Sequence, residues 1–200
     1  WLLKTFRAQY GTVLNDRALN ILNKDNFENI FEAGCGAGAS SLVHMLRIFD
    51  LRYPNGKLNE EYKNIIYTGI DLNLTRVENA KKYLPIFFNY YKNCINFILE
   101  EGDLTNLKFQ DNAFDFTFIP SVLEAVPETD VDNVISEICR VSKNYIFITD
   151  PYDQYPLGYP RSEKELSKYF IKYGFKLEFF EYKITDTFMP NKCVLQTMFK

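Results

Sequence analysis

The sequence NIFEAGCGAG, residues 29–38, joins a short apolar run to three alternating glycines. The run Asn29–Ala33 has the length and composition of a buried strand. Gly34, Gly36 and Gly38 follow it directly and lead into a helical pattern. Glycine is needed where the backbone turns sharply or where a ligand lies against the main chain. Because a helix start has free N–H groups and a positive dipole end, this turn predicts a site for a ligand that carries an anionic group.

Strand-like and helix-like runs alternate over the rest of the chain. Apolar runs of strand length predict six more strands, at residues 65–71, 96–103, 114–120, 145–149, 176–184 and 193–199. Helical spacing predicts helices at residues 2–22 (divided at Gly11), 40–49, 75–85, 131–141 and 162–174. Two of these helices begin with capping-box pairs, Thr75 with Glu78 and Ser162 with Glu165. The polar residues 51–64 are expected to form a surface loop.

This order of elements predicts an α/β fold: a doubly wound, mostly parallel, seven-stranded sheet with helices on both faces. The last two runs have no helix between them, so they are expected to pair as a C-terminal antiparallel hairpin. We expect a main domain at residues 27–200 and an N-terminal helical annex at residues 1–26.

Composition excludes several classes of protein. The 200 residues are 46% hydrophobic with a formal charge of -3, which indicates a globular chain without the basic surface of a double-stranded nucleic-acid binder. The cysteines have no C-x-x-C spacing, so we expect free thiols, no metal site and a cytoplasmic protein. Neither a signal peptide nor an apolar run of the ~20 residues that span a bilayer is expected.

The segment EAGCGAG, Glu32 to Gly38, resembles the first motif of the class I S-adenosylmethionine-dependent methyltransferases. The resemblance extends from about Asn29 to the C-terminus and includes the terminal hairpin. It implies a Rossmann-like sheet, S-adenosyl-L-methionine as the cofactor, and methyl transfer as the activity. In many small-molecule members of this family, N-terminal helices form a lid over the site, which suits residues 1–26 here.

The resemblance also implies which residues bind the cofactor. Glu32 supports the glycine loop and contacts the methionine amino group, Asp71 binds the ribose hydroxyls, and Asp103 binds the adenine amino group. Leu72 and Leu104 pack against the adenine, and Ser121 lies near the cofactor at the end of the fourth strand. The complete expected set is Glu32, Gly34, Cys35, Gly36, Gly38, Asp71, Leu72, Asp103, Leu104 and Ser121.

The catalytic base is not identified by the sequence. Many relatives have a histidine where this chain has Ala125, and the only histidine, His44, is expected to face solvent on its helix. Methyl transfer does not always need a base, because in-line positioning of the nucleophile supplies much of the catalysis. The candidate acceptor-binding or basic residues are Tyr10, Glu124, Asp150, Tyr152 and Tyr155, each with ordinary structural use as the alternative.

The acceptor is expected to be a small molecule methylated on an oxygen or nitrogen atom. The loop at residues 150–161, rich in Tyr and Pro, suits a planar or moderately apolar acceptor, with plain loop packing as the alternative. After the fourth strand the chain reads IPSV instead of the N/D-P-P-Y/F of nucleic-acid amino methyltransferases, which is against base methylation. A protein or peptide acceptor, a non-catalytic cofactor-binding scaffold and aminopropyl transfer are the other readings. The oligomeric state stays open.

Overall fold

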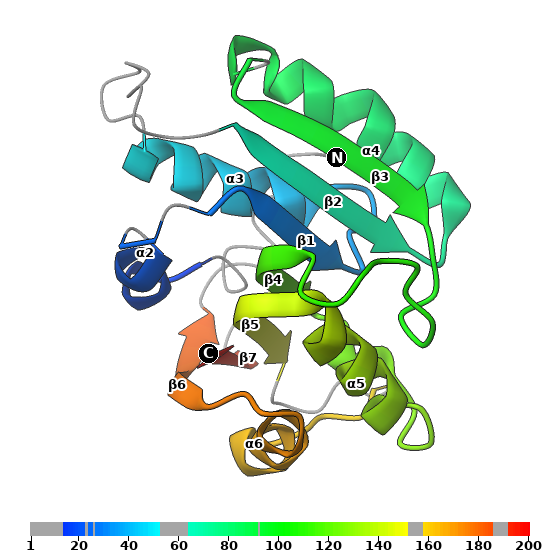
Figure 1. Cartoon of the computed structure of the whole chain (residues 1–200), viewed down its shortest axis with the longest axis vertical. Coiled ribbons are helices and arrows are strands. Elements are labelled where there is room, and N and C mark those ends of the chain that lie inside the picture. Colours follow the sequence, from blue (N-terminus) through cyan, green and yellow to red (C-terminus); the bar gives the residue numbers. More distant parts are fainter. Residues whose placement is uncertain are drawn as a thin grey trace.

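The computed structural model describes residues 14–22, 24, 25, 27–52, 64–91, 93–151, 158–185 and 192–200. In this part of the chain seven strands form one sheet in the order β3-β2-β1-β4-β5-β7-β6 (Figure 1). Only β7 is antiparallel to its neighbours, β5 and β6. The expected parallel sheet with a terminal hairpin is therefore confirmed. The strands are β1 (Asn29–Ala33), β2 (Ile65–Asp71), β3 (Ile95–Glu101), β4 (Phe114–Pro120), β5 (Ser142–Pro151), β6 (Leu177–Thr185) and β7 (Lys192–Phe199).

Helices cover both faces of the sheet (Figure 1). One face packs against α2, α3 and α4 and the other against α5 and α6, each with its own cluster of buried apolar side chains. Successive residues of β1 point to opposite faces, so Ile30 enters the first cluster and Phe31 the second. Burial on both faces is why β1 reads as a continuous apolar run. The helices are α2 (Asp16–Leu22), α3 (Ala39–Arg52), α4 (Leu74–Phe87), α5 (Val131–Val141) and α6 (Glu163–Lys172), with short 3-10 turns η2 (Asn89–Tyr91) and η3 (Leu123–Ala125).

The two predicted capping boxes have different outcomes. Ser162 and Glu165 form the box at the start of α6, as expected. The box at Thr75 was wrong: Asn73 is the N-cap of α4, and its side chain accepts a hydrogen bond from Arg76 N at 3.1 Å. Asparagine caps helices better than threonine, and Glu78 pairs instead with Lys81 one turn later.

The prediction that His44 faces solvent was also wrong. Its side chain is 1% exposed and its ring stacks on Phe118 of β4, with the centroids 4.3 Å apart. The helical-wheel reading counted only apolar residues as core positions. In the structure Ser41, His44 and Ile48, spaced by three and four residues, are all buried on α3. The buried stripe of α3 therefore contains polar side chains.

Several predicted boundaries shift. Helix α3 extends to Arg52, and α4 passes Pro85 to end at Phe87. Strand β5 begins at Ser142 and ends at Pro151, longer at both ends than the predicted 145–149. The helix at residues 2–12, the loop at 53–63 and the turn of the terminal hairpin lie outside the described residues. No helix in the described part of the chain has the length and apolar character needed to cross a bilayer.

Candidate functional site

The glycine turn after β1 is shaped by contacts that exclude side chains. Gly34 has φ +73°, and a Cβ placed on it would lie 2.4 Å from Val122 Cγ2. Gly38 has φ +83°, and its Cβ would lie 2.9 Å from Leu84 Cγ. These backbone angles are open to glycine at little cost. Main chain and neighbouring side chains therefore meet directly at the carboxyl end of β1, where ligands bind in open α/β sheets.

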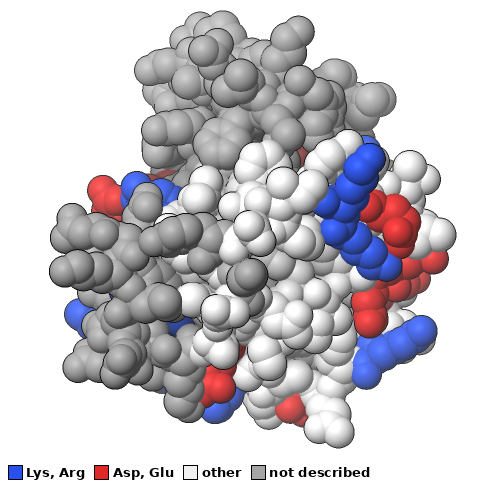
Figure 2. Space-filling view, turned by 90° about the horizontal axis from the view of Figure 1, so that it is seen from above, with Lys and Arg blue, Asp and Glu red and all other residues white. Residues whose placement is uncertain are grey.

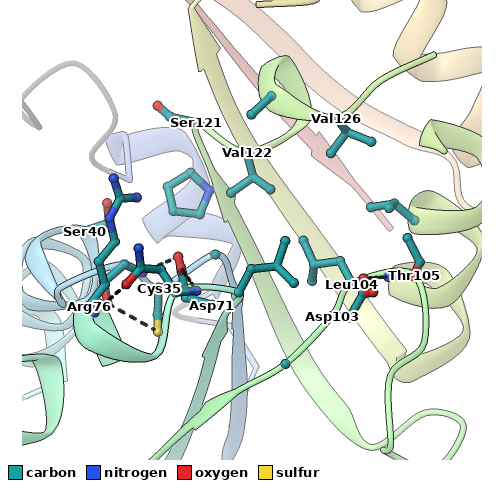
Figure 3. Close-up of a pocket in the computed structure, with 18 of the residues that line it drawn as sticks. Cys35, Ser40, Asp71, Arg76, Asp103, Leu104, Thr105, Ser121, Val122 and Val126 are labelled. Atoms are coloured by element: carbon teal, nitrogen blue, oxygen red, sulfur yellow. Dashed lines mark hydrogen bonds between the residues drawn. The ribbon is translucent and has the colours of Figure 1, made fainter. Parts of the chain in front are cut away.

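Asp71 connects the end of β2 to the glycine turn. Its Oδ2 accepts a hydrogen bond from Gly36 N at 3.0 Å, and its Oδ1 accepts one from Asn73 N at 2.9 Å (Figure 3). Cys35 N adds a second connection by donating to Ile70 O at 2.8 Å. A carboxylate has about four lone-pair sites, so Asp71 retains capacity to accept two further hydrogen bonds.

The end of β3 supplies the third side of the site. Asp103 is exposed, and its Oδ1 accepts a hydrogen bond from Thr105 N at 2.8 Å, which closes a tight turn after the strand. Leu104 is half-buried beside it, and Leu72, after β2, is 71% exposed. An apolar side chain as exposed as Leu72 is available to pack against a ligand.

The segment after β4 lies opposite the glycine turn. Ser121 has a positive φ of 53°, which is uncommon for a residue other than glycine, and its N–H donates to Thr149 O at 2.6 Å. Figure 3 shows Ser121, Val122 and Val126 above the space that Asp71 and Leu104 border from below. Backbone strain of this kind is often found at ligand sites.

These elements enclose a cavity of about 880 Å³. Its size lies within the range of small-molecule and cofactor sites. Of the predicted cofactor residues, Glu32 and Gly38 are the two that do not line it. The sequence analysis did not predict Ser40, Asn73, Arg76, Thr105, Val122 or Val126 as lining residues. The one sequence feature that could have indicated them is that each lies within five positions of a predicted residue. The lining comprises Gly34–Ala37, Ala39, Ser40, Asp71–Asn73, Arg76, Gly102–Thr105, Pro120–Val122, Ala125–Pro127, Asp130 and Val134.

Glu32 lies beneath the glycine turn and is fully buried. Its Oε2 accepts hydrogen bonds from the hydroxyl groups of Ser41 on α3 and Tyr67 on β2. Loss of hydration on burial raises the pKa of the Glu32 carboxyl to about 8, against the smaller lowering effect of the two hydroxyls. The Glu32 side chain therefore connects β1 to α3 and β2, and its burial favours the protonated carboxyl group.

Asp150, one of the predicted acceptor residues, lies at the end of β5 beneath the segment after β4. It is 3% exposed, and its Oδ1 accepts a hydrogen bond from Val122 N at 3.1 Å. Burial, with the nearby charge of Glu124, raises the pKa of the Asp150 carboxyl to about 8. Neither Asp150 nor Glu124 is part of the cavity lining, and Tyr10, Tyr152 and Tyr155 lie outside the described residues.

The chain is similar to known methyltransferases in sequence and in fold. A family model described as a methyltransferase domain matches residues 24–190. The chain belongs to this methyltransferase family.

Solved methyltransferases share the fold at low sequence identity. An S-adenosylmethionine-dependent methyltransferase from Methanosarcina mazei is 18% identical, with 93% of this chain and 97% of that chain covered and a TM-score of 0.65. Magnesium protoporphyrin IX methyltransferase (ChlM) from Synechocystis, with bound SAH, is 16% identical, with 98% and 83% covered and a TM-score of 0.64. The trans-methyltransferase CalH, also with SAH, is 16% identical, with 98% and 58% covered and a TM-score of 0.71. No curated protein sequence matches the chain.

Proposed function

We propose that this methyltransferase transfers the methyl group of S-adenosylmethionine to an oxygen or nitrogen atom of a small-molecule acceptor. The observation that carries the proposal is a cavity that joins the glycine turn to a largely apolar wall after β4. The glycine turn, Asp71 and Asp103 provide polar groups for a nucleoside with an amino-acid tail. Val122, Ala125 and Val126 provide an apolar side on which an acceptor can pack.

The cofactor would lie along the carboxyl ends of the first three strands in chain order. Asp71 would accept from the ribose hydroxyls, and Asp103 from the adenine amino group, with Leu72 and Leu104 on the adenine ring. The glycine turn would lie against the methionine part. When bound, the cofactor supplies a methyl group already activated by its sulfonium. Glu32 would support this arrangement without contacting the cofactor. Its carboxyl accepts hydrogen bonds from Ser41 and Tyr67 and does not line the cavity.

The chain's own contribution to the chemistry is positioning. Ala125 borders the cavity where a histidine would be a candidate base, and His44 is buried against Phe118. An acceptor that reaches the methyl group in line requires mainly correct orientation and exclusion of water. The assignment of Glu124, Asp150, Tyr10, Tyr152 and Tyr155 to acceptor binding stays a prediction.

Charge and fold neighbours support a small acceptor over a polymer. Figure 2 shows one face on which the described Lys and Arg side chains lie beside Asp and Glu and form no continuous basic surface. Within the described part of the cavity lining, Arg76 is the one basic side chain. The similar structure ChlM is, by its name, a methyltransferase of magnesium protoporphyrin IX. A small, uncharged or weakly charged acceptor is in keeping with both observations.

Isotope labelling tests the acceptor class. The protein would be incubated with methyl-labelled S-adenosylmethionine and a cell extract separated into small-molecule, protein and nucleic-acid fractions. We expect label in the small-molecule fraction, and none in any fraction with a Gly34→Ala variant. Label confined to the protein fraction would replace the proposal with the protein or peptide alternative. Binding of the cofactor without label in any fraction would support the scaffold alternative.

Removal of the Asp71 carboxylate is expected to weaken cofactor binding. Asp71→Ala removes the acceptor for ribose hydroxyls as well as the bond to Gly36 N, so we expect a loss of about 1–3 kcal/mol in affinity. Titration calorimetry with S-adenosylhomocysteine measures it. Asp115→Ala is the matched control, because Asp115 Oδ2 accepts from Glu28 N and Asn29 N at the opposite end of the sheet. Unchanged affinity in Asp71→Ala would mean that the ribose is held elsewhere.

A further inference from the structure

One wall of the cavity is a short segment, Ser121–Glu128, between β4 and α5. Five of its residues line the cavity, namely Ser121, Val122, Ala125, Val126 and Pro127. Its only regular structure is the single 3-10 turn η3. Buried main-chain groups of such a segment need partners outside it. The shape of the wall therefore depends on the groups that bind its N–H and C=O groups.

The N–H groups at the start of the wall are bound from β5. Val122 N donates to Oδ1 of the buried Asp150 carboxyl group at 3.1 Å, and Ser121 N donates to Thr149 O at 2.6 Å. Val122 is also the residue whose side chain meets the glycine turn at Gly34. Strand β5 thus fixes the point at which the wall touches the glycine turn.

Two carbonyl groups of the wall accept hydrogen bonds from one arginine that precedes α6. Arg161 Nη1 donates to Leu123 O, and Arg161 Nη2 donates to Val126 O at 2.8 Å and to Glu128 Oε2 at 3.1 Å. The Arg161 side chain is 6% exposed and comes from a position 33 to 38 residues away along the chain. A planar guanidinium with five donors can bind several acceptors in fixed geometry, which an ammonium group cannot.

The position of Arg161 is itself fixed by its neighbours. The next residue, Ser162, is the N-cap of α6 and forms the capping box with Glu165. On the other side, Tyr159 N donates to Glu124 O at 2.6 Å, and a Cβ on Gly158 would lie 3.1 Å from the same oxygen. The backbone around Arg161 is therefore packed directly on the wall.

We propose that Arg161 is a positioning residue for cofactor binding: its guanidinium, opposite the Asp150 carboxyl group, holds Ser121–Glu128 in the conformation that forms the cavity wall. Asp150 binds the N–H side of the segment and Arg161 binds the carbonyl side. Arg161 acts through Leu123, Val126 and Glu128 and does not line the cavity. The inference rests on the proposed cofactor site and adds a residue that holds this site from outside.

Arg161→Lys tests the inference, because it keeps the charge and removes the forked geometry. We expect affinity for S-adenosylhomocysteine to fall by about tenfold or more, comparable to the loss of one charge-assisted hydrogen bond. Amide hydrogen exchange is expected to rise in residues 121–128 while the central strands stay protected. Arg52→Lys is the matched control: Arg52 is 2% exposed and donates to Phe27 O at 3.1 Å, near the opposite end of β1. Its affinity is expected to stay within about twofold of wild type.

Other outcomes would overturn the inference. Wild-type affinity in Arg161→Lys would show that the wall does not need the arginine, and equal affinity losses in both arginine variants would show a general effect of stability. If Arg161→Lys does not fold, Gly158→Ala is the second variant. Its added methyl group would lie 3.1 Å from Glu124 O and displace the same wall without removing a charge. Wild-type affinity in Gly158→Ala would overturn the inference. Failure of the wild-type protein to bind S-adenosylhomocysteine would instead contradict the proposed cofactor site.

Discussion

Replacement of Gly34 by alanine is expected to lower cofactor affinity by at least about 100-fold. The added methyl group would collide with Val122 Cγ2, so the glycine turn, the Val122 side chain or the wall after β4 must move. Both elements border the cavity, and movement of either changes its shape. The positive φ of 73° adds a backbone cost of about 1–2 kcal/mol for a residue with a side chain. Titration calorimetry with S-adenosylhomocysteine measures the loss directly.

Gly174→Ala is a matched control for this experiment. Gly174 has φ +92°, similar to Gly34, but nothing lies within 4 Å of a Cβ placed on it. The control variant carries the backbone cost without the collision with Val122. We expect it to unfold at a lower temperature than wild type and to bind the cofactor normally. Equal losses of affinity in the two variants would show that the contact of Gly34 with Val122 is unimportant for binding.

The free energy of unfolding is expected to decrease between about pH 5 and pH 8, and Glu32→Gln is expected to remove much of this decrease. The folded-state pKa of Glu32 is about 8, against 4.5 for an unperturbed glutamate, so in this range the folded state binds the proton that the unfolded state has released. Stability from such a group is fully present below pH 4.5 and declines as the pH rises toward 8. Each unit of pKa difference corresponds to about 1.4 kcal/mol.

Glutamine at position 32 keeps an oxygen that can accept from Ser41 and Tyr67 but does not ionise. The stability of Glu32→Gln relative to wild type should therefore increase by about 2–4 kcal/mol from pH 5 to pH 8. Urea unfolding at several pH values measures this difference, and contributions from all other groups cancel in the comparison. A constant difference across the range would show that Glu32 is ionised in the folded protein at neutral pH.

The stability of Asp150→Asn relative to wild type is likewise expected to increase from pH 5 to pH 8, and urea unfolding at several pH values measures it. The Asp150 carboxyl also has a folded-state pKa of about 8, against 3.8 when unperturbed, so its contribution is lost in the same direction. Partly exposed acids whose pKa is lowered by Lys or Arg partners, such as Asp132 and Glu137, act with the opposite sign and at lower pH. The decrease in the free energy of unfolding above pH 5 is thus expected to come from the buried acids Glu32 and Asp150.

Local signals predicted the elements of the fold well. The apolar runs located all seven strands, three of them with the predicted ends and four with shifts of up to three residues at an end, and the capping box at Ser162 located the start of α6. Errors arose where several local signals competed. The start of α4 was assigned to Thr75 because of its capping-box spacing, whereas Asn73 is the actual cap.

The residues predicted to bind the cofactor follow directly on strand ends, and most of them share one cavity. Eight of the ten predicted residues line the cavity, since the carboxyl ends of neighbouring parallel strands meet at one edge of the sheet. The contacts that shape the wall after β4, and the burial of Glu32 and Asp150, could not be predicted from the sequence. The hydrogen bond from Val122 N to Asp150, for example, joins residues 28 positions apart and has no local signal, while the assignment of Asp150 to acceptor binding stays a prediction.

The glycine turn, the order of strands and helices, and the methyltransferase family could be predicted from the amino-acid sequence, because each depends on short-range spacing or on a contiguous motif. The folded structure was needed to show that Val122 lies against Gly34, that His44 stacks on Phe118, and that Arg161 binds the carbonyls of Leu123 and Val126. These contacts join residues 35 to 88 positions apart, and such separations leave no periodic pattern in the chain. The burial that raises the pKa of Glu32 likewise arises only when β1, β2 and α3 pack together.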